Sequence, residues 1–534
     1  MALPAHGALR LHGPEYLRGA LASLYVRRQY RPLWNVSGVA TEQARTAVAL
    51  LTRAEKYGLQ PEDYEATPLS EALQRLQAHP PTQAAQPDAV QAWGAFDVSL
   101  STALLAFVAD LHGGRIDPHA AGYELPRIQD GFDVPGFVAQ LSTSADAAAL
   151  LGRAEPAFIH YELLKGALQR YRALAAVPGL TQLPALPTRV VQPGADYAGA
   201  TALRRLLFAI ACLPASALTD KPVLDAPLVA ALRRFQALHG LPVDGRLGPL
   251  TYAALITPMS WRVRQIELTL ERWRWVPRLT GRTLIVNIPE FRLFAFQSEQ
   301  DSESGMLRMD VIVGTQYRRT PIFAATMRTV IFRPYWDVPH SIAVHEILPK
   351  LARDARYLDA QHLELVKGQT DASPIVPASP ENLRLLALGR LRLRQRPGTD
   401  NALGLVKFLL PNVHDVYLHD TPEGILFGQA RRTFSHGCIR VADPVALAVY
   451  ALEGTRGDWN AARVQAAMHA QATQRVSLAV PVNVLILYGT AVASEDGTVH
   501  FSDDVYALDR TLQTLLDLPM PVSSRDMPPP ASAD

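Results

Sequence analysis

The hydrophobic pattern of the chain changes its period near residue 282, and this change constrains the fold more than any other feature. After it, short segments rich in Val, Ile, Leu, Phe and Tyr are bounded by Gly, Pro and Asn, which predicts β-strands. Before it, apolar residues recur every three or four positions, which predicts helices. Because 534 residues exceed what one hydrophobic core holds, we predict a multidomain α+β protein. The expected helices include 15–29, 40–56 and 90–112, and the expected strands are 283–296, 307–314, 328–333, 404–410, 413–419 and 482–488.

The helical half divides into two predicted domains. Residues 1–190 form a helical scaffold domain, and the Pro-rich segment 180–193 at its end is typical of a linker. Residues 195–260 form a compact three-helix domain. Its middle helix, 227–239, stops at Gly240, where a residue without a side chain favours a helix end.

The β-rich half forms a third predicted domain, 280–516, which carries the chemistry. About 60 residues, 344–401, interrupt its strands. An insertion of this size is typical of a lid over a site or of a disordered loop. We expect the last residues, 519–534, to be a disordered tail.

Composition excludes several classes of protein. A formal net charge of +2 gives no reason to expect a nucleic-acid partner. Apolar stretches such as 206–213 fall short of the roughly 20 residues that span a bilayer, so no transmembrane segment is expected. Two cysteines exclude a disulfide framework. Cys212 lies in an apolar run and is expected to be a buried small hydrophobic residue.

The other cysteine lies in the most informative stretch, 414–452. Alternation in this stretch places Tyr417 and His419 on one face of a strand, opposite Val416 and Leu418. Fifteen residues separate His419 from Ser435-His436-Gly437-Cys438, which is followed by the short strand IRV. Asp443 and Pro444 next start a helix that is expected to run to Gly454. The cysteine therefore lies in a tight loop, in which Gly437 permits unusual backbone angles.

These residue types suit acyl transfer, which needs a thiolate, a base and donors for an oxyanion. A neighbouring imidazolium lowers the pKa of a free cysteine from about 8.5 into the working range, and His419 and His436 are the two candidates. His419 is the favoured base, since a strand end holds a ring more rigidly than a loop, and the N–H groups of Gly437 and Cys438 are candidate oxyanion donors. Two alternatives remain: an inert structural site, or a zinc site, whose nitrogen and sulfur ligands would be His414, His419, His436 and Cys438.

The motif H-x15-SHGC, followed by a hydrophobic residue and Arg, resembles the signature of the YkuD-fold L,D-transpeptidases. Other segments are similar to the large Gram-negative YcbB-type branch. The pattern FQ-x2-HGL-x-VDG-x-LG-x-LTYAAL resembles a peptidoglycan-binding domain, although a spacer that binds nothing is an alternative. The branch resemblance lies in YRPLW (30–34), GLQPEDY (58–64), DLHGGRIDP (110–118), VNIPEF (286–291), VIVGTQYRRTPIF (311–323), FRPYWDVPHSIA (332–343), RLRQRPGTDNALGLVKF (392–408), YLHDTP (417–422) and EDGTVHFSDDVY (495–506).

The resemblance implies a role for each motif residue. It makes Cys438 the nucleophile and His419 the general base, with His436 beside them and 344–401 as a capping subdomain. Arg440 is implied as an anchor for peptide carboxylates, but shorter relatives carry Asn there, so a structural role in the loop is an equal alternative. The implied substrate-binding residues are Tyr417, Trp336, Ser435 and Arg440.

The implied reaction is a 3→3 cross-link between peptidoglycan stem peptides, formed through a thioester after release of D-alanine from a tetrapeptide. No metal or organic cofactor is implied. Carbapenem β-lactams are expected to acylate the cysteine, and peptidoglycan synthases and carboxypeptidases are candidate partners. The alternatives are an L,D-carboxypeptidase or endopeptidase that uses water, and a wall-binding module with an inert catalytic fold.

A periplasmic location is expected, with the leader processed, because 1–16 lacks signal-peptide features; a cytoplasmic protein is the alternative.

Overall fold

The computed structural model forms two compact units. Unit 1 contains the described residues up to Leu279, residue 301 and those from Tyr488 on, and unit 2 contains Thr280–Ser298 and Gly305–Leu487. Helices dominate unit 1 and strands dominate unit 2, so the predicted multidomain α+β class is confirmed. The expected tail, 519–534, lies outside the described residues, which are 11–78, 87–125, 128, 130–298, 301, 305–354 and 356–517.

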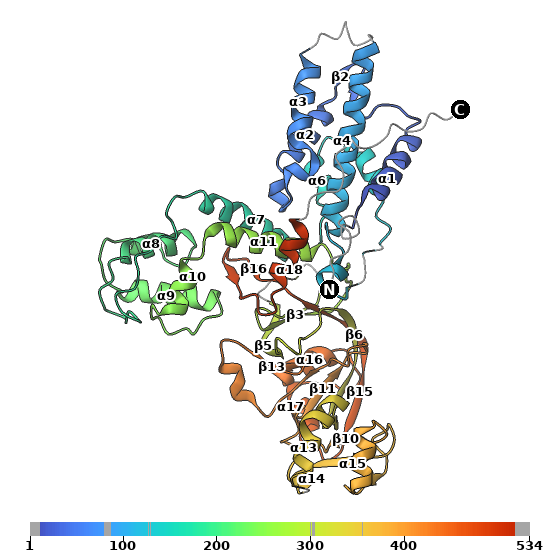
Figure 1. Ribbon diagram of the computed structural model, residues 1–534, viewed down its shortest axis with the longest axis vertical. Helices are drawn as coiled ribbons and strands as arrows, with labels where there is room; N and C mark the ends of the chain where they lie inside the picture. Colours follow the sequence, from blue (N-terminus) through green and yellow to red (C-terminus); the bar gives the residue numbers. More distant parts are fainter. Residues whose placement is uncertain are drawn as a thin grey trace. The chain divides into compact units, whose positions relative to one another are not determined.

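The N-terminal helices of unit 1 pack around one apolar core, which includes Leu24, Trp34, Leu104 and Phe107. The expected helices are confirmed, but the one expected at 40–56 ends at Leu51 and continues as a 3-10 turn, η2 (Ala54–Tyr57). The helices are α1 (Pro14–Arg27), α2 (Glu42–Leu51), α3 (Ala66–Gln77), α4 (Pro87–Gly113), α5 (Val134–Leu141) and α6 (Ala147–Leu151), and Figure 1 shows them as a group at the blue end of the chain.

One of these helices, α4, is long and apolar enough to cross a membrane by length and composition alone. The sequence predicted a helix at 90–112 but no transmembrane segment. Its most apolar window is 67% buried inside the structure, and a buried core helix passes the same test of length and composition as a membrane span.

A second core in unit 1 joins the predicted three-helix domain to the segments 161–191, 266–270 and 491–501. The segment 180–193, predicted as a linker, forms no helix or strand, but Leu183 and Val191 are buried in this core and Val191 forms an isolated β-bridge with Leu247. Unit 2 ends at Leu487, short of the expected domain end at 516, because the C-terminal hairpin and helix pack against α7 and α11. The elements are α7 (Ile159–Ala175), α8 (Ala200–Ala209), α9 (Ala226–Leu238), α10 (Pro249–Leu255), α11 (Met259–Trp273), β16 (Ala491–Ala493), β17 (Val499–Phe501) and α18 (Leu508–Leu516).

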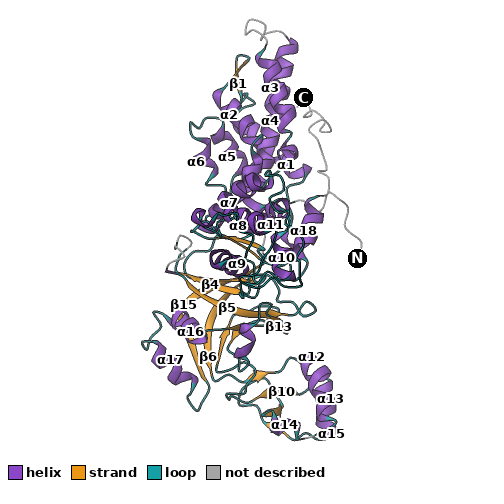
Figure 2. Cartoon of the chain, turned by 90° about the vertical axis from the view of Figure 1, so that its left-hand side faces the viewer, coloured by secondary structure: helices purple, strands orange, loops and turns teal. Residues whose placement is uncertain are grey.

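Unit 2 is built on a sheet of nine described strands in the order β13-β5-β14-β12-β11-β6-β15-β3-β4. A further β4–β5 pairing closes the strands from β5 to β4 into a ring. Figure 2 draws these strands in orange. Their bounds are β3 (Thr283–Asn287), β4 (Arg292–Phe296), β5 (Leu307–Gly314), β6 (Ala324–Phe332), β11 (Val406–Leu409), β12 (Leu418–His419), β13 (Thr433–Ser435), β14 (Ile439–Val441) and β15 (Gln474–Leu487).

Two strand predictions need correction. The segment 283–296 is a hairpin rather than one strand, since the chain turns at Phe291, whose φ is +55°. In 413–419 only the last two residues are strand, because Asp415 has a φ of +54°. The helix predicted after Asp443 is confirmed as α16 (Pro444–Leu452), although it ends two residues before Gly454.

The insertion forms a small subdomain with its own apolar core, which includes Val338, Ile347, Leu365 and Leu393. Its sheet has the order β7-β10-β8-β9 and begins at Trp336, earlier than the expected boundary at residue 344. The segment Arg392–Gln395 is a strand in which Leu393, between two arginines, belongs to this core. The elements are β7 (Trp336–Asp337), α12 (His340–Ile342), the π-helical turn η8 (Ala343–Ile347), α13 (Leu348–Leu351), α14 (Tyr357–Ala360), β8 (Leu363–Val366), β9 (Ile375–Val376), α15 (Pro380–Ala387) and β10 (Arg392–Gln395).

Candidate active site

Three neighbouring strands of unit 2 place polar side chains in one row. Lys407 of β11 lies opposite His419 of β12, and His419 lies beside Arg440 of β14. Since side chains alternate along a strand, Tyr417 and Cys438, each two positions earlier, belong to the same face. Val416 and Leu418 are buried in the core on the other face, as predicted.

His419 is buried and held in one orientation. Its Nδ1 lies 2.5 Å from the backbone carbonyl oxygen of Asp420. A carbonyl only accepts, so Nδ1 carries the proton and Nε2 keeps a lone pair. Burial, reinforced by the nearby charges of Arg440 and Lys407, lowers the pKa of His419 to about 3. The ring is therefore neutral at physiological pH, as a general base requires.

The loop that carries Cys438 is fixed from inside by Ser435. The Ser435 hydroxyl donates to the Cys438 carbonyl over 2.5 Å and accepts from the Gly437 N–H over 3.1 Å. Thr320 donates to the Gly437 carbonyl over 2.8 Å. Gly437 has a φ of +120°, which confirms the predicted need for glycine.

These bonds change two of the expected roles. Ser435 is buried and bonded within the loop, so its geometry supports a role in holding the loop rather than in contacting substrate. The Gly437 N–H is already bonded to Ser435, which leaves it poorly placed as an oxyanion donor. Among the described residues no partner of the Cys438 N–H is found, so this group is the better candidate donor.

Cys438 is partly exposed, and its thiol lies 3.8 Å from the backbone carbonyl of Asp415. Burial raises the pKa of Cys438, while hydrogen bonding to Tyr417 and the positive charge of Lys407 lower it, and Asp415 raises it. Burial is the largest effect, so the thiol is mainly protonated at neutral pH. Of the two histidines expected to lower the pKa of this cysteine, His419 is neutral and His436 pairs with Glu346.

Tyr417 joins the cysteine to the insertion. Burial and its hydrogen bond to Cys438 keep the pKa of the Tyr417 phenol well above its usual value, while a hydrogen bond from Trp336 acts in the opposite direction. The Tyr417 and His419 rings meet edge to face, with centroids 5.7 Å apart. The structure thus brings together Cys438, Tyr417 and Trp336, three of the residues that the resemblance implies for the site.

His436 points toward the insertion. Its Nε2 lies 3.0 Å from Glu346, a residue of η8, and Glu346 also accepts from Arg318 over 2.5 Å. Both partners lower the pKa of Glu346. His436 therefore pairs with the subdomain, although the sequence placed it beside the nucleophile.

Arg440 forms an ion pair with Glu423, in the segment that follows β12. Of the two roles left open by the sequence, this contact supports the structural one, because the guanidinium already holds a carboxylate of the chain.

The described residues include no group of three or more His, Cys, Asp and Glu that could hold a metal ion. The four candidate zinc ligands are not gathered: His414 packs on Phe323, and His436 pairs with Glu346.

Sequence reasoning missed Lys407. Its Nζ lies 3.6 Å from the centroid of the Tyr417 ring. A signal was present, since a lysine in the otherwise apolar strand LVKFLL has to face either solvent or a site. Its strand partner, however, is not readable from local pattern.

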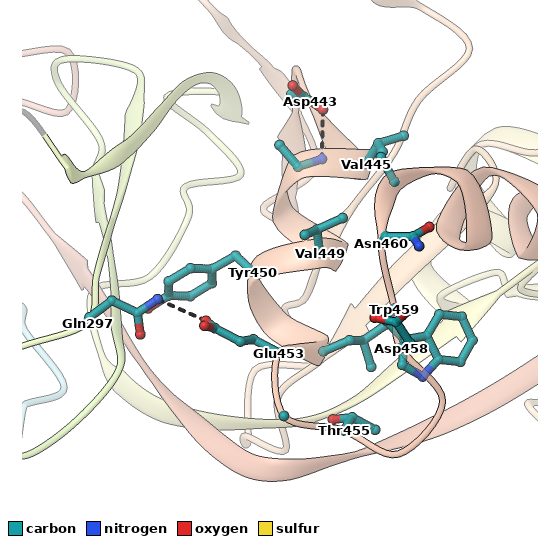
Figure 3. Close-up of a pocket in the computed structure, with 14 residues that line it drawn as sticks. Gln297, Asp443, Val445, Val449, Tyr450, Glu453, Thr455, Asp458, Trp459 and Asn460 are labelled. Carbon is teal, nitrogen blue, oxygen red and sulfur yellow. Dashed lines mark hydrogen bonds between the residues drawn. The ribbon is translucent and has the colours of Figure 1, made fainter.

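A cavity of about 890 Å³ lies beside α16 and α17 (Ala461–Met468), but it is separate from this chemistry (Figure 3). None of the motif residues from Ser435 to Cys438 line it. Its polar side chains already serve the fold: Asp443 caps α16 and Gln297 donates to Glu453. Cys212 is also outside the site, since it is buried in unit 1 and burial raises its pKa to about 12.

Comparison with known proteins agrees with this geometry. Residues 281–464 match the family model of the YkuD L,D-transpeptidase catalytic domain, residues 201–255 match a "Putative peptidoglycan binding domain", and residues 19–168 match a "Scaffold domain". The chain is also similar to a "Putative L,D-transpeptidase" of Haemophilus influenzae, with 30% identity over 249 residues. That match covers 47% of the chain and 49% of the relative, so it spans about half the length of the curated relative. The chain thus contains an L,D-transpeptidase catalytic domain and a peptidoglycan-binding-type domain.

Proposed function

We propose that the chain is a periplasmic cysteine L,D-transpeptidase that forms 3→3 cross-links in peptidoglycan, and that it belongs to the large YcbB-type branch. The observation that carries the proposal is the shared face of Cys438, Tyr417 and His419, with a neutral imidazole whose Nε2 is free to accept a proton. A thiol in the loop directly before β14 and a neutral base on the adjacent strand β12 suit acyl transfer. The peptidoglycan-binding-type domain supports a peptidoglycan substrate.

The proposed reaction has two steps. In the first, Cys438 Sγ attacks the carbonyl carbon of the diaminopimelate at position three of a tetrapeptide stem, while His419 Nε2 takes the thiol proton. The C–N bond to D-alanine breaks, His419 protonates the leaving amine, and a thioester remains. In the second, the side-chain amine of another stem attacks the thioester. The C–S bond breaks, an amide forms, and the amine proton returns to sulfur through His419.

The test is to incubate the wild-type chain with a purified disaccharide-tetrapeptide and to analyse the protein and the products by mass spectrometry. We expect a thioester adduct on the protein, free D-alanine and cross-linked dimers. A carbapenem is expected to give a stable adduct at the same cysteine. Cys438→Ala, in which the nucleophilic sulfur is absent, is the control and is expected to give neither adduct.

Other products would contradict the proposal. Tripeptide monomers without dimers would identify water as the acceptor and make the chain an L,D-carboxypeptidase. An adduct at Cys212, or none at all, would remove Cys438 from the nucleophile role.

The pH dependence of acylation follows from the protonation states. A thiol and a neutral imidazole react together, so acylation needs His419 unprotonated. Because the pKa of His419 is lowered to about 3, this form persists as the pH falls from 8 to 5. We expect the carbapenem acylation rate to stay nearly constant over that range. A loss of rate centred at about pH 6.5, the ordinary pKa of histidine, would mean that His419 retains its usual pKa.

A further inference from the structure

Lys407 lies inside the candidate active site without a described carboxylate partner. The described neighbours that change the pKa of its ammonium group, apart from burial, act through their charge and not through a hydrogen bond. Its Nζ instead lies over the ring of Tyr417, at 3.6 Å from the centroid, and a cation in this position is attracted by the aromatic face. Burial lowers the pKa of Lys407, as expected for a cation that has lost water, while the negative form of Cys438 raises it.

A partly buried cation without a paired anion is costly to a fold. The charges that act on Lys407 from neighbouring elements are Cys438, Asp337, Arg475 and Asp415. Two of these are already engaged, since Asp337 pairs with Arg392 of β10 and Arg475 pairs with Asp371. The anions that remain to balance the ammonium are Asp415 and the sulfur of Cys438 when it loses its proton, and Cys438 has the larger effect on Lys407.

The other cations near the nucleophile are not available for this task. His419 is neutral, because its pKa is lowered to about 3. Arg440 pairs with Glu423, and His436 pairs with Glu346. Lys407 is the positive group that lowers the pKa of Cys438, and Asp415 opposes it.

We propose that Lys407 supplies the fixed positive charge that stabilises the Cys438 thiolate, while His419 only carries the proton. This inference rests on the proposed function for its place in the reaction. Lys407 acts on the sulfur directly through its positive charge. It also acts through Tyr417, because its Nζ lies over the Tyr417 ring and the Tyr417 hydroxyl forms a hydrogen bond with the sulfur. If Lys407 were purely structural, it would only support the Tyr417 ring by packing. An uncharged side chain of similar length would then leave the reactivity of Cys438 unchanged.

The experiment measures alkylation of the whole chain by iodoacetamide from pH 6 to 10, with the labelled cysteine located by peptide mass spectrometry. Lys407→Met keeps the length of the side chain and removes the charge. We expect its alkylation midpoint for Cys438 to rise by about one pH unit, which is a tenfold slower reaction at a given pH below the midpoint. Lys407→Arg is expected to restore most of the wild-type profile.

Controls separate charge from folding. Lys367→Met removes an exposed lysine of the insertion and is expected to leave the profile unchanged. If Lys407→Met lowers the melting temperature of the chain, Lys407→Gln provides a second neutral variant that retains a polar end. Coincident wild-type and Lys407→Met or Lys407→Gln profiles would overturn the inference.

Iodoacetamide needs no peptidoglycan substrate, so this test stands apart from the proposed function. A shifted midpoint in a chain that forms no cross-links would support the role of Lys407 and contradict the transpeptidase. Cross-linking with unchanged midpoints would support the transpeptidase and contradict the role of Lys407.

Discussion

His419→Ala is expected to lower the rate of Cys438 acylation by about 10²–10⁴-fold, the usual contribution of a positioned general base. The thiol is mainly protonated at neutral pH, since burial raises the pKa of Cys438, so attack requires an acceptor for its proton. Nε2 of His419 is that acceptor, because Nδ1 is committed to the Asp420 carbonyl. The measurement is the single-turnover rate of carbapenem adduct formation, followed by intact-protein mass.

The matched control for this variant is His345→Ala, which removes an exposed histidine of the insertion and is expected to leave the rate unchanged. Since His419 is buried, its removal also creates a small cavity, and melting curves have to show that the variant is folded. His419→Gln, which keeps an amide donor toward Asp420 without a base, is expected to be as slow as alanine. A rate within threefold of wild type in a folded variant would exclude His419 as the base.

Local sequence pattern predicted the parts of the site that depend on one segment. Alternation around Leu418 assigned Tyr417 and His419 to one face, and Asp443 with Pro444 predicted α16. A glycine before the cysteine predicted the positive φ of Gly437. Each of these follows from the residue itself or from its immediate neighbours.

The features that the sequence did not predict depend on pairing between distant segments. Lys407 reaches the site only because β11 pairs with β12 in one register, and a shift by one residue would turn it away. Glu346 meets His436 only because the insertion folds back on the loop. The pKa of His419 depends on how deeply three strands bury it, and the motif alone suggested an imidazolium instead.

The second large effect is expected in unit 1, at Glu271 of α11. Its carboxylate is fully buried and accepts from the backbone N–H groups of Arg115 and Ile116, at 2.5 and 3.1 Å. It also pairs with the buried guanidinium groups of Arg115 and Arg274, at 3.4 and 3.0 Å. Removal of one partner of a buried ion pair typically costs about 3–5 kcal/mol, because the remaining charge stays buried without compensation. We expect Glu271→Gln to lower the free energy of unfolding of unit 1 by this amount.

The loss should depend on pH in a defined direction. Burial raises the pKa of Glu271, but Arg115, Arg274 and the two backbone N–H groups together lower it by more than burial raises it. The net pKa therefore lies below the ordinary value. A carboxyl with a lowered pKa in the folded state stabilises above its unfolded pKa of about 4.3, and this contribution is lost as the pH falls. The free energies of unfolding of wild type and Glu271→Gln, measured by calorimetry, should therefore differ most at pH 6–8 and converge below about pH 4.

Glu71→Gln, on an exposed position of α3, is the control and is expected to change stability by less than about 0.5 kcal/mol. A gap between wild type and Glu271→Gln that stays constant down to pH 3 would mean that the carboxylate charge is not what joins α11 to the segment after α4.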